Sequence, residues 1–123
     1  MSQHIRLGTI SIDCQDPARL RDFYADLLGW QRGDMYNWPS AASDDVVLLF
    51  MNENRDYVSP VWPEQPGAQQ KQIHLDFQAD DVPAAVAKAE SLGATRADLH
   101  QGDAHWVVMR DPEGHVFCVC ESD

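Results

Sequence analysis

The order of strand-like and helix-like segments occurs twice along this chain, and this repeat limits the fold more than any other feature. Residues 5–14 and 72–78 alternate apolar and polar side chains, which is the period of a half-buried strand. Residues 16–29 and 80–93 follow them with apolar side chains at helical spacing. Each helical segment begins near an Asp that can cap it and ends at a Gly. The second copy follows the first at an offset of about 64–65 positions.

The segments after each helix are rich in β-forming residues and complete two modules. They comprise residues 46–51 in the first copy and residues 105–110 and 115–120 in the second. Two copies indicate a pseudo-symmetric domain, because a solenoid needs more repeats. We predict one domain of residues 1–123, because each half alone is small for a stable core. The first module spans about 3–58, a Pro-rich linker about 59–71, and the second module about 72–123.

The charge of the chain excludes several kinds of partner. A formal net charge of −11 and a pI near 4.6 oppose binding to nucleic acid and to anionic membranes. The longest strongly apolar run, residues 46–51, is too short to span a bilayer. The first ten residues lack the apolar centre of a signal peptide. We therefore expect a cytoplasmic protein with neither a membrane nor a nucleic-acid partner.

Three cysteines, Cys14, Cys118 and Cys120, give an odd count without a C-x-x-C pair. This pattern favours reduced thiols in a cytoplasmic protein. We interpret them as small buried apolar residues. A thiol nucleophile or a site for a soft metal is the alternative.

The alternation also predicts which side chains share a sheet face. If each helix covers the apolar face of its own sheet, the polar positions lie on the opposite face. The residues of this opposite face are Thr9, Ser11 and Asp13 in the first module and His74, Asp76, Gln78, Phe117, Val119 and Glu121 in the second. This assignment turns Val116, Cys118 and Cys120 toward the helix. We predict an α+β fold in which two open sheets enclose a cleft lined by the polar set.

His74 and Asp76 lie two residues apart in one strand, so a carboxylate would lie beside an imidazole. Such a pair acts as a general base when a substrate proton comes within hydrogen-bond reach. The alternative is a neutral histidine that is hydrogen-bonded in a partly wet cleft. Asp13 and Asp76 are either a coupled carboxylate pair or ordinary solvated residues. Glu121 is either functional or part of a frayed chain end.

Four tryptophans are many for a chain of 123 residues. Trp38 and Trp62 are flanked by prolines, and we predict that they lie in loops and line a pocket or a dimer interface. Trp30 and Trp106 are predicted to pack in the core or to pin a loop.

The motifs resemble the vicinal oxygen chelate superfamily, which includes glyoxalase I, extradiol dioxygenases, and bleomycin- and fosfomycin-resistance proteins. The resemblance rests on the strand "HLDF", a helix that ends "SLGA", and "VVMRDPEGHVFCV". The segment "DCQDPARLRDFYADLLGW" is similar to bacterial glyoxalase-like domains in particular. The resemblance covers nearly the whole chain and implies two pseudo-symmetrically paired βαβββ modules. It also implies a homodimer.

Metal-dependent members of this superfamily take up to four ligands from four strands. The resemblance places the first ligand at Thr9, with Ser11 as the next choice, and neither residue type is a good ligand for zinc, nickel or iron. The second falls in "VVLLFMN", which holds neither a His nor a carboxylate. The third and fourth fall at His74 and Glu121. Asp76 could serve as a further ligand, and His105 could approach, although the sequence does not fix its direction.

Three functions follow from these features. The first is a small-molecule-binding protein or a metal-independent enzyme, and whether the protein is an enzyme is left open. Its catalytic residues would be His74, Asp76 and Glu121, and its ligand-binding residues Thr9, Ser11, Asp13, Trp38, Trp62 and Phe117. The alternative is a lyase, isomerase or dioxygenase in which His74 and Glu121 bind a divalent metal such as zinc, nickel, manganese or iron. The third is an interaction module that uses its Trp-bearing loops and acidic surface.

Overall fold

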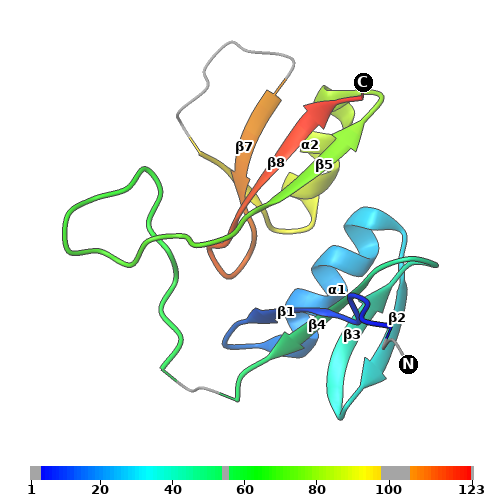
Figure 1. Ribbon diagram of the computed structural model, residues 1–123. Coiled ribbons are helices and arrows are strands. Elements are labelled where there is room, and N and C mark those ends of the chain that lie inside the picture. The colour runs from blue at the N-terminus through cyan, green and yellow to red at the C-terminus, as the bar shows by residue number, and fades with distance from the viewer. Residues whose placement is uncertain (1–3, 54–55, 98–105, 123) are drawn as a thin grey trace. The chain divides into compact units, whose positions relative to one another are not determined.

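The structure is a computed structural model that describes residues 4–53, 56–97 and 106–122 (Figure 1). The chain divides into two compact units, Met1–Tyr57 and Val58–Asp123. Among the described residues, each unit contains one helix and one four-stranded open sheet. This arrangement confirms the predicted α+β class and the presence of two similar modules. Within the described ranges, no helix is both long enough and apolar enough to cross a membrane.

The first unit follows the order strand, helix, three strands. Its elements are β1 (Ile10–Asp13), α1 (Pro17–Leu28), β2 (Gln31–Met35), β3 (Trp38–Ala42) and β4 (Val47–Met51). The sheet order is β1-β4-β3-β2, with β1 parallel to β4. Helix α1 begins where predicted, because the Asp16 side chain accepts a hydrogen bond from the Arg19 backbone N–H at 3.2 Å. It ends at Gly29, whose φ of 68° lies in the left-handed region.

A tight hairpin joins β2 and β3. Its two turn residues, Tyr36 and Asn37, have φ angles of 54° and 66°. Two left-handed residues in succession form the type I′ turn, whose twist suits an antiparallel hairpin. Trp38 therefore begins strand β3 and pairs with Met35. The predicted loop position of Trp38 is therefore wrong. The turn was not recognised in the sequence, because neither Tyr36 nor Asn37 is a glycine, the residue that most clearly signals such a turn.

Helix α1 packs against one face of the first sheet. The rings of Tyr24 on α1 and Phe50 on β4 are stacked, with centroids 5.8 Å apart. Phe50 is paired with Ile12 in the parallel ladder, so Ile12 shares its face. Ser11 and Asp13 alternate with Ile12 and therefore lie on the face that α1 does not cover.

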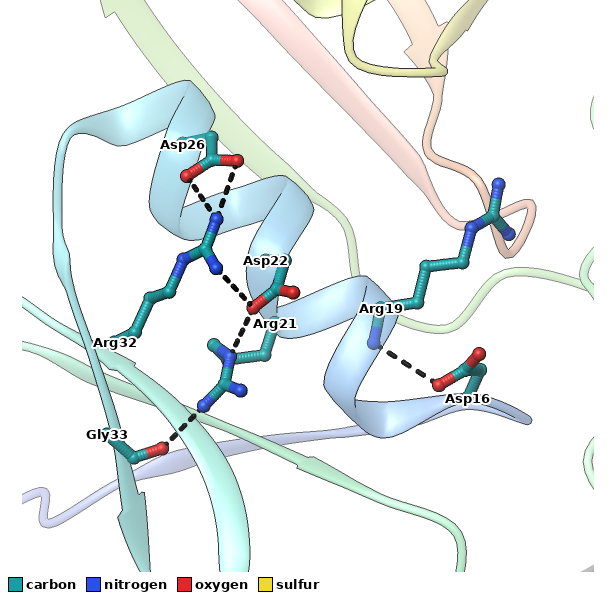
Figure 2. A network of polar contacts seen from close by, with 7 residues as sticks. All are labelled: Asp16, Arg19, Arg21, Asp22, Asp26, Arg32 and Gly33. Atoms are coloured by element: carbon teal, nitrogen blue, oxygen red, sulfur yellow. Dashed lines mark hydrogen bonds and ion pairs between the residues drawn. The ribbon is translucent and has the colours of Figure 1, made fainter.

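A polar network fastens α1 to the neighbouring strand β2, as Figure 2 shows. Arg21 donates to Asp22 at 2.6 Å and to the Gly33 carbonyl at 2.7 Å. Arg32 on β2 donates to both carboxylate oxygens of Asp26 at 2.8 and 2.9 Å. A second nitrogen of Arg32 lies 3.4 Å from Asp22. These contacts hold the helix in register with the sheet that it covers.

The second unit repeats the plan. Its elements are β5 (Leu75–Ala79), α2 (Val82–Ser91), β6 (Thr95–Arg96), β7 (Trp106–Arg110) and β8 (Val116–Glu121). The sheet order β5-β8-β7-β6 matches that of the first unit, with β5 parallel to β8. Of the two candidate caps, Asp81 is the one used, since its side chain accepts from the Ala84 N–H at 3.0 Å. The final turn of α2 leads to Gly93, whose φ is 111°.

The predicted "DPEG" turn joins β7 and β8. Asp111 is buried, and its Oδ1 accepts hydrogen bonds from the N–H groups of Glu113 and His115 at 2.8 and 3.0 Å. Gly114 has a φ of 89°, where a side chain would be strained and would meet Ser59. This turn fixes where β8 starts, and therefore which of its side chains face which way.

The two faces of the second sheet have different cover. The strand register defines two sets of side chains, one on each face. We call one face the α2 face, and it carries Leu75, Phe77, Phe117 and Val119. We call the other the Cys118 face, and it carries Asp76, Val108, Val116, Cys118 and Cys120. A cluster of buried residues on the Cys118 face consists of Ala97, Val108, Val116 and Cys118 and includes no residue of α2. The helix buries Val82, Val86 and Ala89 and lies along β8, so it packs on the face of Phe117.

This register corrects the predicted facing of β8. Phe117 is fully buried on the α2 face, where its ring centroid lies 5.8 Å from that of Phe77. It therefore does not share a face with Asp76, so its predicted facing is wrong, while its role in ligand binding stays a prediction. Cys118, which was predicted to face the helix, lies on the opposite face beside Asp76.

Candidate functional site

An imidazole and a carboxylate meet at the start of β5. His74 immediately precedes the strand, and its Nε2 lies 3.3 Å from Oδ1 of Asp76. The two side chains are 39% and 60% exposed. A polar contact this exposed contributes little to stability. The pair therefore has little structural value, while both groups remain within reach of a solute.

Cys118 completes a group of three potential ligands. It is paired with Asp76 across the parallel strands and is only 3% exposed. Its Sγ, a ring nitrogen of His74 and a carboxylate oxygen of Asp76 all lie within 4.8 Å of one another. The three groups supply a soft, a borderline and a hard donor from two adjacent strands. A metal ion or a polar ligand group could be held among them.

The thiol of Cys118 is protonated at neutral pH. Burial raises its pKa to about 11, and Asp76 and Cys120 raise it further, while a hydrogen bond with Trp106 acts in the opposite direction. Burial and the Asp76 carboxylate also raise the pKa of Cys120. A reactive cysteine needs a lowered pKa, because the thiolate is the nucleophile. The arrangement therefore disfavours a thiol nucleophile at either position.

Two tryptophans border this group. Trp106 is paired with Cys120, lies on the Cys118 face and is 37% exposed. Trp106 begins a strand, as the sequence predicted, but its ring is partly accessible and is not buried in the core. Trp62 packs against the buried cluster of the Cys118 face, so part of that face is covered by an aromatic ring.

Trp62 is held in place by its own segment and by β7. The Arg110 guanidinium donates to the Trp62 carbonyl. The Lys71 ammonium lies 3.7 Å from the centroid of the Trp62 ring and 3.4 Å from Glu64. The indole N–H of Trp62 is buried and has no hydrogen-bond partner among the described residues. A buried donor of this kind is uncommon and marks a place where an acceptor would be favourable.

Glu121 does not join His74. In the parallel ladder Glu121 is opposite Ala79, five positions beyond His74 along β5. Five residues of strand span about 16 Å. Ligands of one transition-metal ion lie only about 3–4 Å apart, since each bond is about 2 Å long. The predicted pairing of His74 with Glu121 is therefore wrong within this sheet, and Glu121 shares the parity of Phe117 and Val119, which places it on the α2 face.

The candidates of the first unit lie on or next to β1 and β3. Ser11 and Asp13 are exposed on the face opposite α1, and Thr9 lies just before β1. Trp38 is partly buried and lies two residues before Ser40 in β3, so the two share a face. Ser40 pairs with Leu49, which pairs with Ser11, so this is also the face of Ser11. Their roles in ligand binding stay predictions. His105 lies outside the described residues.

Cys118 was only an alternative candidate in the sequence, where it was interpreted as a small buried residue that faces the helix. Strand β8 is apolar at nearly every position, so hydrophobic alternation cannot tell its two faces apart. The usable signal was the adjacent strand, because parallel pairing places a residue of β8 on the same face as its partner on β5. Without the register, the parity of β8 could not be fixed.

The sequence model of a family described as glyoxalase-like domain matches residues 9–120. The chain belongs to the glyoxalase-like domain family. This match confirms the predicted superfamily and covers both modules of the glyoxalase-like fold. No curated protein matches the sequence.

Solved structures with the same fold come from several functional groups. A glyoxalase/bleomycin resistance protein/dioxygenase family enzyme from Burkholderia phytofirmans PsJN has 19% identity and a TM-score of 0.69, over 92% of this chain and 95% of that chain. TnmS3, an antibiotic-binding protein from Streptomyces sp. CB03234, has 19% identity and a TM-score of 0.60, over 98% and 100%. The fosfomycin resistance protein FosX from Listeria monocytogenes has 12% identity and a TM-score of 0.69, over 98% and 94%. At these identities the likeness concerns the fold.

Proposed function

We propose that this glyoxalase-like protein binds a small organic molecule on the Cys118 face of its second sheet. The observation that carries the proposal is the exposed contact between His74 and Asp76 on a face that α2 leaves uncovered. Trp106 on the same face offers a partly exposed ring for stacking. A few polar groups beside aromatic surface are typical of small-molecule sites.

The likeness to an antibiotic-binding protein and to a fosfomycin resistance protein supports a ligand of metabolite or drug size. An aromatic or amphipathic molecule with at least one polar oxygen suits the available groups best. Its ring would stack on Trp106, and its oxygen would accept a hydrogen bond from the imidazole N–H of His74. Thr9, Ser11, Asp13 and Trp38 stay predicted ligand contacts from the first unit. The cytoplasmic location and the homodimer also stay predictions.

A metal-independent enzyme is the second candidate, and the contact between His74 and Asp76 favours it. In this function the imidazole accepts a substrate proton, and the Asp76 carboxylate orients the ring and stabilises its charged form. Binding alone and this proton transfer use the same residues. Turnover of a bound compound is what separates the two candidates.

The test is a binding screen with a panel of aromatic metabolites and antibiotics, followed by tryptophan fluorescence titration of the hits. We expect saturable binding that His74→Ala weakens at least tenfold. His4→Ala, an exposed histidine of the first unit, is the matched control and leaves the affinity unchanged. A hit whose affinity is the same in the His74→Ala, Asp76→Ala and Trp106→Ala proteins would place the ligand elsewhere and overturn the proposal.

A further inference from the structure

We infer that His74, Asp76 and Cys118 form a binding site for Zn²⁺ or a similar borderline divalent ion, supplied entirely by the second unit. The superfamily resemblance suggested a metal held by His74 and Glu121, and the register rules out that pair within the sheet. Cys118 takes the place of Glu121, and Asp76 adds a third donor. The inference goes beyond the proposed function and does not require an organic ligand.

The geometry needs only small adjustments. The three ligand atoms lie within 4.8 Å of one another, whereas donors around one zinc ion stand about 3–4 Å apart. His74 and Asp76 are the exposed members of the group, so their side chains can rotate toward an ion without disturbing the core. Cys118 is fixed by its strand and by the buried cluster around it. The rigid thiol therefore sets the position, and the two exposed groups close around it.

The donor set selects the kind of ion. A thiolate favours zinc or copper(I) over magnesium, calcium and manganese, and an imidazole suits zinc. The carboxylate of Asp76 disfavours copper(I), which prefers thiolate and thioether ligands. Three protein donors leave one position of a tetrahedral zinc ion open, as in catalytic zinc sites. In the described part of the chain, no other group of three such donors meets the same spacing.

The surroundings support ion binding on one side and access on the other. Val108, Val116 and Trp62 form an apolar base next to Cys118. Apolar surroundings strengthen the attraction between a cation and its ligands. The opposite side, with His74 and Asp76, is accessible to solvent. An ion can therefore enter from water and bind against a dry base.

Titration of the tag-free, metal-free full-length protein with Co²⁺ and then Zn²⁺ tests the site. Cobalt bound to a thiolate gives a charge-transfer absorption in the near-ultraviolet, and zinc displaces it. We expect one equivalent of cobalt with this band. Cys118→Ser removes the band and weakens zinc binding about 100-fold or more, because loss of outer-shell partners alone costs 10–100-fold.

Two matched variants keep the result interpretable. Cys120→Ser changes a thiol on the same strand face and is expected to keep the band, as is Cys14→Ser in the first unit. His74→Gln changes an exposed residue, so the protein stays folded even if Cys118→Ser does not. It is expected to weaken zinc binding at least tenfold. No thiolate band in the unmutated protein, a band that depends on Cys120 alone, or full affinity in His74→Gln would each overturn the site.

The outcome is separable from that of the organic-ligand screen. Cobalt and zinc are titrated without any organic compound, and the screen is run with metal-free protein. Loss of the metal site with retained ligand binding leaves the proposed function standing. Metal binding without any organic ligand leaves the metal site standing.

Discussion

The two sheets share one plan but carry different chemistry on the face that their helix leaves uncovered. The strand pair β1 and β4 places Ser11 beside Leu49, and the matching pair β5 and β8 places Asp76 beside Cys118. Just before these strands stand Thr9 and His74. At equivalent positions the first sheet therefore offers hydroxyls and an aliphatic side chain, whereas the second offers three groups that can bind an ion or move a proton. The comparison teaches that a duplicated scaffold can concentrate its reactive groups in one copy.

The largest expected effect tests whether the helix-covered faces are alike. Phe50 on β4 and Phe117 on β8 are both fully buried beneath their helices. Replacing either by Ala should destabilise the protein by about 3–5 kcal/mol, since each leaves a large cavity. Denaturant unfolding measures the effect. Glu90→Ala, on the exposed side of α2, is the control and should stay within about 0.5 kcal/mol.

The Phe117 variant also discriminates between the two possible facings of β8. If Phe117 lined the ligand site, its replacement would cost much less stability than that of Phe50 and would change ligand affinity. Equal stability losses with unchanged affinity per folded molecule agree with the observed register.

The next effect concerns the thiol that distinguishes the second sheet. In a protein with Cys14→Ser and Cys120→Ser, thiolate absorbance should show Cys118 titrating near pH 11 rather than at its usual pKa of 9.0. Asp76→Asn should lower this pKa, because the nearby negative charge is removed. Trp106→Phe should raise it, because a hydrogen bond that favours the thiolate is lost. A midpoint near 9 in the folded, metal-free protein would contradict the burial of this thiol.

The same shift predicts the sign of a pH effect on stability. The folded state holds the proton more tightly than the unfolded chain, whose thiol titrates near its usual pKa. The stability contributed by the Cys118 thiol is therefore fully present below pH 9.0 and is lost as the pH rises toward about 11. Unfolding curves for the single-thiol protein and for its Cys118→Ser variant, measured across this range, should converge at high pH. Parallel curves would contradict the linkage.

A smaller effect compares the two helix starts. Asp16 and Asp81 cap α1 and α2 in the same way, through a backbone N–H three residues on. Asp16→Ala and Asp81→Ala should each cost about 1 kcal/mol in the free energy of unfolding. Asp44→Ala is the matched control, because it removes one negative charge at an exposed position outside the helices. A cap variant that behaves like Asp44→Ala would show that the cap is not used in solution.

The smallest effect compares the two arginines that join α1 to β2. Arg32 is half-exposed and contacts Asp22 and Asp26, so Arg32→Ala should change the free energy of unfolding only slightly. Arg21 is more buried and also donates to the Gly33 carbonyl. Arg21→Ala should therefore cost more than Arg32→Ala in thermal or denaturant unfolding. Added salt should reduce the Arg32 effect further, because exposed charges are screened.

Much of the fold could be predicted from local signals. Both helices begin at an Asp and end near a Gly, and both edge strands β1 and β5 show clear alternation, because one of their faces is polar. The hairpin at Tyr36 and Asn37 could not be predicted, because neither residue signals a left-handed turn as glycine does.

The candidate site was predicted in part for a related reason. His74 and Asp76 stand out against apolar neighbours, so their common face was evident. Strand β8 is buried on both faces, and its sequence gives no alternation that would fix its parity. Only the pairing with β5 brings Cys118 to Asp76 and leaves Phe117 and Glu121 apart from them. To predict a site whose residues are distant in the chain, one needs the pairing register of the strands as well as the hydrophobic pattern of the sequence.

The unpartnered indole of Trp62 bears on how such a protein can diverge. An unsatisfied buried donor costs a folded protein about 1–3 kcal/mol, and phenylalanine would fill much of the same space without it. Selection for stability alone would favour the replacement of Trp62 by Phe, whereas selection for discrimination among ligands that carry oxygen atoms would oppose it. A relative with Phe at this position is expected to melt at a higher temperature and to accept a broader range of compounds.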